Sequence, residues 1–89
     1  MLKIYGSMLC PDCVQCCKEL KEAQIPFEYY DFSESLRYLK EFLKLRDENA
    51  VFTEPRASGK IGIPCILRPD GTVTLEWDEF LKYTKGRAY

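Results

Sequence analysis

The sequence predicts a single α/β domain in which helices flank a four-stranded mixed sheet. Runs rich in strand formers alternate with runs of helical periodicity, and an Asp-Gly pair separates the last two strand-like runs. A chain of 89 residues forms one domain, and 46% hydrophobic residues are enough for a modest core. The expected domain therefore spans residues 1–89.

Two strand–helix pairs occupy the first half of the chain. We expect strands at residues 2–5 and 27–32, and helices at about residues 11–24 and 36–46. Pro11 suits the first turn of a helix, and Ile25-Pro26 stops that helix. The apolar face of the second helix is expected to comprise Leu36, Leu39, Phe42 or Leu43, and Leu45.

A connector and a hairpin follow in the second half. Residues 47–62 are expected to link the elements, with one helical turn at residues 53–58 closed by Gly59. Asp70-Gly71 predicts a hairpin between strands at residues 64–67 and 72–76, and a last helix covers roughly residues 77–85. Strands joined through a helix run parallel, whereas hairpin strands run antiparallel. The order β-α-β-α-β-β-α therefore gives a mixed sheet with helices on both faces.

Charge and hydropathy restrict the partners and the location. The chain carries 13 basic and 14 acidic residues, so its overall charge of −1 offers no general attraction to nucleic acid or to an anionic membrane. The first residues lack the apolar stretch of a signal peptide, and no run has the length of a membrane span. We therefore expect a cytoplasmic protein, without nucleic-acid or membrane partners.

The cysteines carry the chemistry. Four of the five lie between positions 10 and 17, which is poor spacing for a secreted disulfide framework. The chain has no histidine, so Cys–His catalysis and histidine-containing zinc sites are excluded. Reactive or metal-binding cysteines are the better interpretation.

Cys10 and Cys13 form a C-x-x-C pair at the start of the first helix. A thiol attacks a disulfide as the thiolate, and an ordinary cysteine, with a pKa of ~8.5, is mostly protonated at neutral pH. At a helix start, free N–H groups and the positive end of the helix dipole favour the anion, so Cys10 is the predicted nucleophile. Cys13, one turn along, is the predicted resolving thiol, which would attack the mixed disulfide formed on Cys10.

These residues and their order resemble those of glutaredoxins over nearly the whole chain. The resemblance rests on Cys10-Pro11-Asp12-Cys13 after a strand and before a helix, and on Ile63-Pro64 before a strand that leads to Asp70-Gly71. It implies a thioredoxin-like fold and a thiol–disulfide oxidoreductase active in cell redox homeostasis. It also implies that Pro64 follows a cis peptide bond beside the dithiol, so that the Ile63 backbone can pair with a peptide or glutathione.

The resemblance implies partners as well. We expect disulfide-containing protein substrates, a low-molecular-weight thiol or a flavoprotein reductase as the source of electrons, and a monomer. No bound cofactor is expected, with glutathione as a candidate reductant.

The chain departs from the glutaredoxin pattern at three places. Ser7 stands where a lysine is usual, Gly62-Ile63 replace a threonine and a valine, and Glu76-Trp77-Asp78 replace a Gly-Gly pair followed by an acid. Asp78 is the candidate substitute for that acid. Because a cation and two glycines that allow close approach are missing, we predict weak glutathione binding.

Other roles for the cysteines stay open at this point. A binding module could hold a metal or an iron–sulfur cluster through Cys10, Cys13 and further cysteines, since Cys16 continues the spacing. A redox-responsive regulator is a third class. Cys16 and Cys65 are expected to pack in the core, although Cys65 would complete a metal cluster if it faced the dithiol. The position of Cys17 is left open between a buried and a partly exposed one.

Overall fold

The computed structural model describes residues 1–77 and 79. Its strands are β1 (Leu2–Gly6), β2 (Phe27–Asp31), β3 (Cys65–Leu67) and β4 (Val73–Thr74). Its helices are α1 (Pro11–Glu22), α2 (Leu36–Glu48), the single 3₁₀ turn η1 (Ala50–Phe52) and α3 (Thr53–Ser58). Of the helix expected at roughly residues 77–85, only Trp77 and Glu79 belong to the described residues, and the rest of the range lies outside them.

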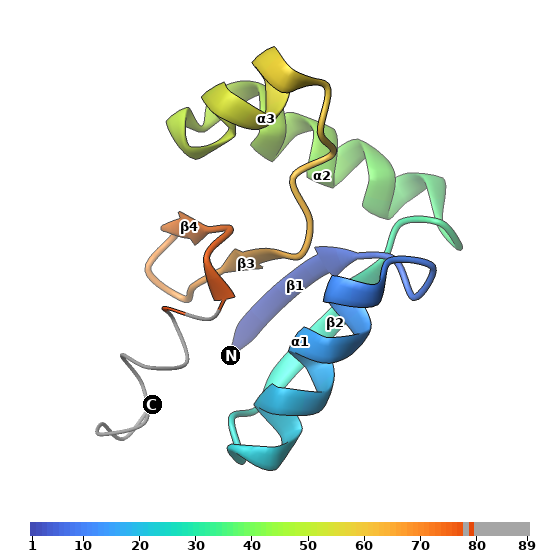
Figure 1. Ribbon diagram of the computed structural model, residues 1–89, viewed down its shortest axis with the longest axis vertical. Coiled ribbons are helices and arrows are strands. Elements are labelled where there is room, and N and C mark those ends of the chain that lie inside the picture. The colour runs from blue at the N-terminus through green and yellow to red at the C-terminus, as the bar shows by residue number, and fades with distance from the viewer. Residues whose placement is uncertain (78, 80–89) are drawn as a thin grey trace.

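The strands form one four-stranded mixed sheet in the order β2-β1-β3-β4 (Figure 1). β1 pairs with β2 in parallel and with β3 antiparallel, and β3 pairs antiparallel with β4. The expected α/β architecture with a mixed sheet is therefore confirmed.

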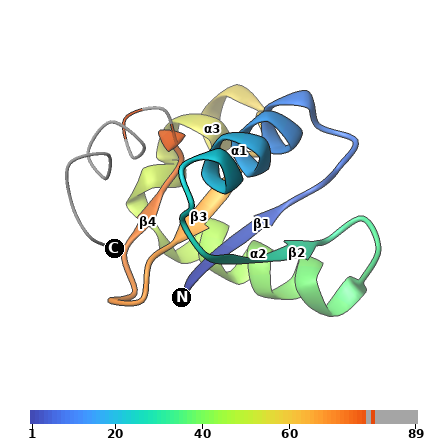
Figure 2. The ribbon, with the colours of Figure 1, turned by 90° about the horizontal axis from the view of Figure 1, so that it is seen from below.

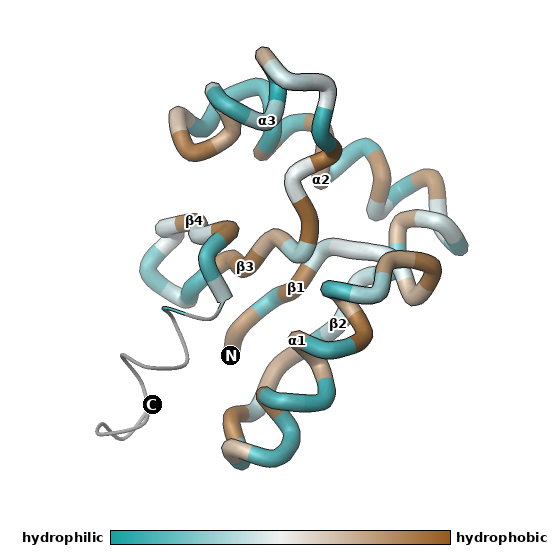
Figure 3. Tube along the Cα trace, viewed as in Figure 1, coloured by the Kyte–Doolittle hydropathy of each residue, from teal (hydrophilic) through white to brown (hydrophobic). Residues whose placement is uncertain are grey.

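Side chains alternate between the two faces of the sheet, and each face has its own helical cover. Figure 2 shows α1 and α2 on opposite sides of the sheet. On the α1 side the buried cluster consists of Leu2, Ile4, Cys16, Leu20 and Ile66. On the other side it consists of Tyr5, Phe42, Phe52, Cys65 and Val73. In Figure 3 hydrophobic and hydrophilic residues alternate along α1 and α2, as expected for helices that are buried on one side.

Local signals explain most of the element ends. Pro11 occupies the first turn of α1, and the Ser35 side chain accepts a hydrogen bond from the Tyr38 N–H at the start of α2. Gly59 ends α3 with a left-handed φ of 75°, as predicted for that turn. The expected apolar face of α2 was partly wrong, because Phe42 is its fully buried residue whereas Leu36 is 74% exposed.

The hairpin forms at the predicted place, although its strands are shorter than expected. Gly71 has a φ of 90°, and the Asp70 carboxylate accepts a hydrogen bond from the Thr72 N–H. The Ile63–Pro64 peptide bond is cis, as the resemblance to glutaredoxins implies. Among residues 1–77 and 79, no helix is long and apolar enough to cross a bilayer.

Candidate functional site

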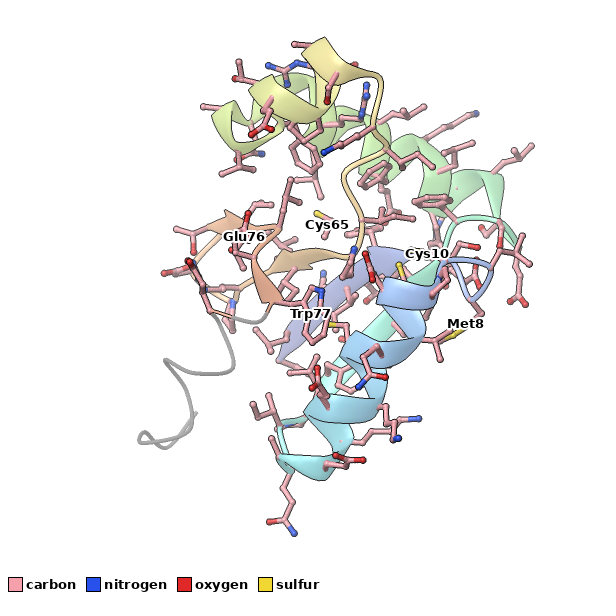
Figure 4. All side chains as sticks on the ribbon, in the orientation of Figure 1. Met8, Cys10, Cys65, Glu76 and Trp77 are labelled. Atoms are coloured by element: carbon pink, nitrogen blue, oxygen red, sulfur yellow. The ribbon has the colours of Figure 1, made fainter. Side chains whose placement is uncertain are left out.

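Cys10 lies at the entrance to α1, where the chain turns from a loop into the helix. It is the N-cap residue, with extended φ and ψ of −96° and 120°, and its N–H donates to the Ser7 carbonyl at 3.0 Å. Its side chain is partly exposed, whereas Cys13 is fully buried. Figure 4 shows Cys10 at the first turn of α1, beside the loop that carries Met8. Solvent and substrate therefore have access to the Cys10 thiol.

Cys13 has a very different environment from Cys10. Burial is the main cause that raises the pKa of the Cys13 thiol to about 12. A hydrogen bond with the Cys10 thiol acts in the same direction, whereas hydrogen bonds with the Ser7 backbone and the Tyr29 hydroxyl lower the pKa. Cys13 is therefore a protonated thiol at neutral pH. Its contact with Cys10 means that the two sulfurs can react with one another, as predicted for an attacking and a resolving thiol.

A close approach between β1 and α1 fixes the position of Cys13. A Cβ placed on Gly6 would lie 2.7 Å from Cys13 Sγ and 2.9 Å from Tyr29 Oη. Only glycine therefore leaves room for the Cys13 side chain at this point of β1. The Tyr29 oxygen is buried and makes no hydrogen bond of regular geometry among the described residues. The Tyr29 hydroxyl faces the Cys13 sulfur and could donate a hydrogen bond to the Cys13 thiolate, which would stabilise that anion.

Two polar side chains hold the loop before Cys10. The Ser7 hydroxyl donates to the Ser33 hydroxyl at 3.1 Å and accepts from the Leu9 N–H at 3.1 Å. The Asp31 carboxylate accepts from the Met8 N–H at 3.2 Å and from the Ser33 N–H and hydroxyl. Desolvation is the largest single effect on the Asp31 carboxyl and raises its pKa, but the hydrogen bonds from Ser33 and Met8 together outweigh it and hold the pKa below its usual value. Ser7 thus anchors the loop before Cys10. The sequence showed only that Ser7 replaces the lysine usual in glutaredoxins and did not predict this role.

The remaining cysteines pack away from the dithiol. Cys16 lies in the core on the α1 side, and Cys65 lies in the core on the α2 side, so both packing predictions are confirmed. Burial raises the pKa of Cys65 to about 12 and also raises that of Cys17. Cys17, whose position the sequence left open, is also buried. Within the described residues, no group of three or more Cys, Asp or Glu side chains is arranged to hold a metal ion.

An open groove with a volume of about 1160 Å³ runs past Cys10. Cys10 and Asp12 line one side, the connector from Gly59 to Ile63 lines another, and Glu76 lies at one end. Of the predicted substrate-binding residues, Ile63 lines this groove, Pro64 is buried next to it in the chain, and Asp78 lies outside the described residues. The groove is large enough for a short peptide segment.

The connector wall of the groove is tied to α2. The Arg46 guanidinium donates to the Lys60 carbonyl at 2.8 Å and to the Ile61 carbonyl at 3.1 Å. Gly62, with a φ of 91°, has the Phe52 ring so close that a Cβ would lie 2.8 Å from it. These contacts fix the backbone of the connector at this wall of the groove. They join segments distant in the chain and were not predicted from the sequence.

Trp77 and two cations of α2 lie outside the groove. Trp77 packs against the core on the α1 side, so its bulk does not line the groove, whereas Glu76 does (Figure 4). On α2, the Arg37 guanidinium pairs with Glu41 at 3.5 Å and stacks on Tyr38. Neither Arg37 nor Lys40 lines the groove.

Comparison with known proteins gives one relative. An uncharacterized protein of Haemophilus influenzae is 37% identical over 73 residues, which cover 82% of this chain and 85% of the relative. No protein-family model matches the chain. No solved structure matches it either.

Proposed function

Because the chain belongs to the same family as this uncharacterized Haemophilus influenzae protein, its activity has to be inferred from the site, and we propose that it is a thiol–disulfide oxidoreductase. The proposal includes a thioredoxin-like, glutaredoxin-type fold and a redox cycle between the dithiol and the disulfide of Cys10 and Cys13. The observation that carries it is the asymmetry of the pair: an accessible thiol caps a helix and contacts a buried, protonated one.

The asymmetry assigns an order to the chemical steps. The Cys10 thiolate attacks one sulfur of a substrate disulfide, the substrate S–S bond breaks, and the first substrate sulfur leaves as a thiolate that takes a proton from solvent. Cys13 then gives its proton to the second leaving sulfur and attacks Cys10 Sγ. The products are two substrate thiols and a Cys10–Cys13 disulfide, and a low-molecular-weight thiol or a flavoprotein reductase returns two electrons.

The groove supports a polypeptide substrate. Ile63 lines it, and the N–H and C=O of Ile63 make no backbone hydrogen bond among the described residues. An extended peptide could pair with these groups as an added strand and present its disulfide to Cys10. We propose that the protein acts as a monomer in the cytoplasm, where thiols are kept reduced.

Trapping the intermediate tests the proposal. A Cys13→Ser protein should hold a substrate thiol on Cys10, because Cys13 no longer resolves the mixed disulfide, and mass spectrometry of peptides would locate the adduct. Cys10→Ser should form no adduct and should lose reduction of bis(2-hydroxyethyl) disulfide by dithiothreitol. Full activity of Cys10→Ser would rule out this mechanism.

Cys16→Ser and Cys17→Ser are the matched controls. Both residues are buried in α1 away from the groove, so these variants should keep most of the activity. Equal loss in all variants, together with metal bound to protein purified under reducing, anaerobic conditions, would instead indicate a ligand cluster.

A further inference from the structure

We infer that the groove beside Cys10 selects disulfide-bonded polypeptides with cationic and apolar side chains next to the disulfide. This inference rests on the proposed oxidoreductase function and names the substrate class. Two properties of the groove carry it: exposed apolar residues along its rims and an excess of carboxylates in its lining.

The rims are unusually apolar for exposed surface. Leu9, next to Cys10, is 86% exposed, while Ile61 and Val51 on the connector side are 54% and 44% exposed, and all three line the groove. Apolar residues grouped around a cleft mark a surface that binds a partner, because binding removes them from water.

The charged residues of the lining have mostly one sign. Asp12, Glu54 and Glu76 line the groove, and Lys60 is the one cation among its described lining residues. The Arg46 guanidinium lies behind the connector wall, bonded to the carbonyls of Lys60 and Ile61. Three carboxylates against one ammonium leave an excess of negative charge. A peptide with lysine or arginine near its disulfide complements this lining.

The same charges oppose glutathione. Glutathione carries two carboxylates and one ammonium, so its net charge has the sign of the groove lining. Ser7, at the position where glutaredoxins have a lysine, is buried and bonded to Ser33. The groove therefore favours a cationic peptide over glutathione, although both could place a disulfide at Cys10.

Three matched peptides test the charge preference. Each carries one leucine and a cysteine joined by a disulfide to 2-mercaptoethanol, with lysine, glutamine or glutamate on both sides of the cysteine. With dithiothreitol as reductant, we expect kcat/KM to fall in the order lysine, glutamine, glutamate, by roughly tenfold overall at low salt. The difference should shrink at about 1 M salt, where charges are screened beyond ~3 Å.

Variants locate the origin of the preference. In the double variant Glu54→Gln with Glu76→Gln, the ratio of kcat/KM for the lysine peptide to that for the glutamate peptide should fall at least threefold. Because a general loss of activity affects both peptides equally, it does not change this ratio. Glu22→Gln is the matched control, because Glu22 is exposed at the far end of α1 and does not line the groove. This control should leave the ratio unchanged.

The apolar rim has its own pair of variants. Leu9→Ser should reduce the preference for the leucine peptide over one with serine in its place. Leu36→Ser, which changes a residue that is 74% exposed on α2 and does not line the groove, should leave that preference intact.

The outcomes separate the two claims. Equal kcat/KM for all three charged peptides, together with normal turnover of bis(2-hydroxyethyl) disulfide, would overturn the substrate class and leave the oxidoreductase function standing. No turnover of the neutral disulfide would overturn the proposed function, and the substrate class with it.

Discussion

Replacing Gly6 of β1 by alanine should displace the Cys13 sulfur from its position beside Cys10. The new Cβ would lie 2.7 Å from Cys13 Sγ and 2.9 Å from Tyr29 Oη, and ordinary contacts begin at 3.4 Å. The sulfur or the strand must therefore move by about 0.7 Å, even though the surrounding atoms are close-packed. Gly6 does not have a positive φ, so the cost of this substitution is steric.

The magnitude follows from the packing. Adding atoms to a filled core costs about 1–3 kcal/mol. We expect about 2 kcal/mol here, since Cys13 is 0% exposed and has no open space to enter. For a domain of this size such a loss lowers the melting temperature by roughly 10 °C. A shift of the Cys13 sulfur relative to Cys10 should also slow resolution of the mixed disulfide by about tenfold or more.

Two assays and one control separate these effects. Thermal unfolding of reduced protein measures the stability, and quenched-flow mass spectrometry measures the lifetime of the mixed disulfide on Cys10. Gly71→Ala is the control: Gly71 has a φ of 90° in the hairpin, and nothing lies within 4 Å of the new Cβ. It should lose stability through backbone strain yet resolve the mixed disulfide normally. Wild-type stability and resolution in Gly6→Ala would refute the close-approach argument.

Three further predictions concern proton-binding groups. The Tyr29 hydroxyl lowers the pKa of Cys13, against the larger effect of burial. Tyr29→Phe should therefore slow resolution of the mixed disulfide and shift the pH profile of that step to higher pH. An unchanged profile would show that Tyr29 takes no part in the mechanism. The pKa of Asp31 is lower in the folded protein, so its contribution to stability is present above pH ~4 and is lost as the pH falls through the folded pKa; urea unfolding of Asp31→Asn should show a weaker acid dependence than wild type. The raised pKa values of Cys13 and Cys65, about 12 each, stabilise the reduced protein below pH ~8.5, and this contribution should be lost as the pH rises toward 12; a flat stability between about pH 8.5 and 11 would contradict it.

Local sequence signals predicted the elements of the fold. Pro11 placed the start of α1, Gly59 the end of α3 and Asp70-Gly71 the hairpin, because each of these residues restricts the backbone where it stands. The parallel pairing of β1 with β2 followed from the helix between them.

The surroundings of the dithiol could not be predicted in the same way. Tyr29 meets Cys13 because the sheet order places β2 beside β1, and Gly6 is required by the distance between β1 and α1. The anchoring of the Cys10 loop by Ser7 depends on Asp31, which is the last residue of β2 and comes after α1 in the chain. Such contacts between distant segments leave no periodic pattern in the sequence.

The connector was the least predictable part of the site. Its single helical turn was expected, but the groove wall exists because Arg46 binds carbonyls fourteen and fifteen residues further along the chain. One signal was present in the sequence: Ile61 is an apolar residue between Lys60 and Gly62, near the end of the connector. Apolar residues in such a segment indicate either core packing or a binding surface.

Redox titration with peptide mapping tests the central claim most directly. The protein is equilibrated in dithiothreitol buffers of stepped potential, quenched with acid and unfolded, and its free thiols are then alkylated and assigned by mass spectrometry. We predict one two-electron transition between the free thiols and a disulfide of Cys10 with Cys13, while Cys16, Cys17 and Cys65 stay free thiols at every potential. A transition that pairs other cysteines, or none at all, would contradict the account.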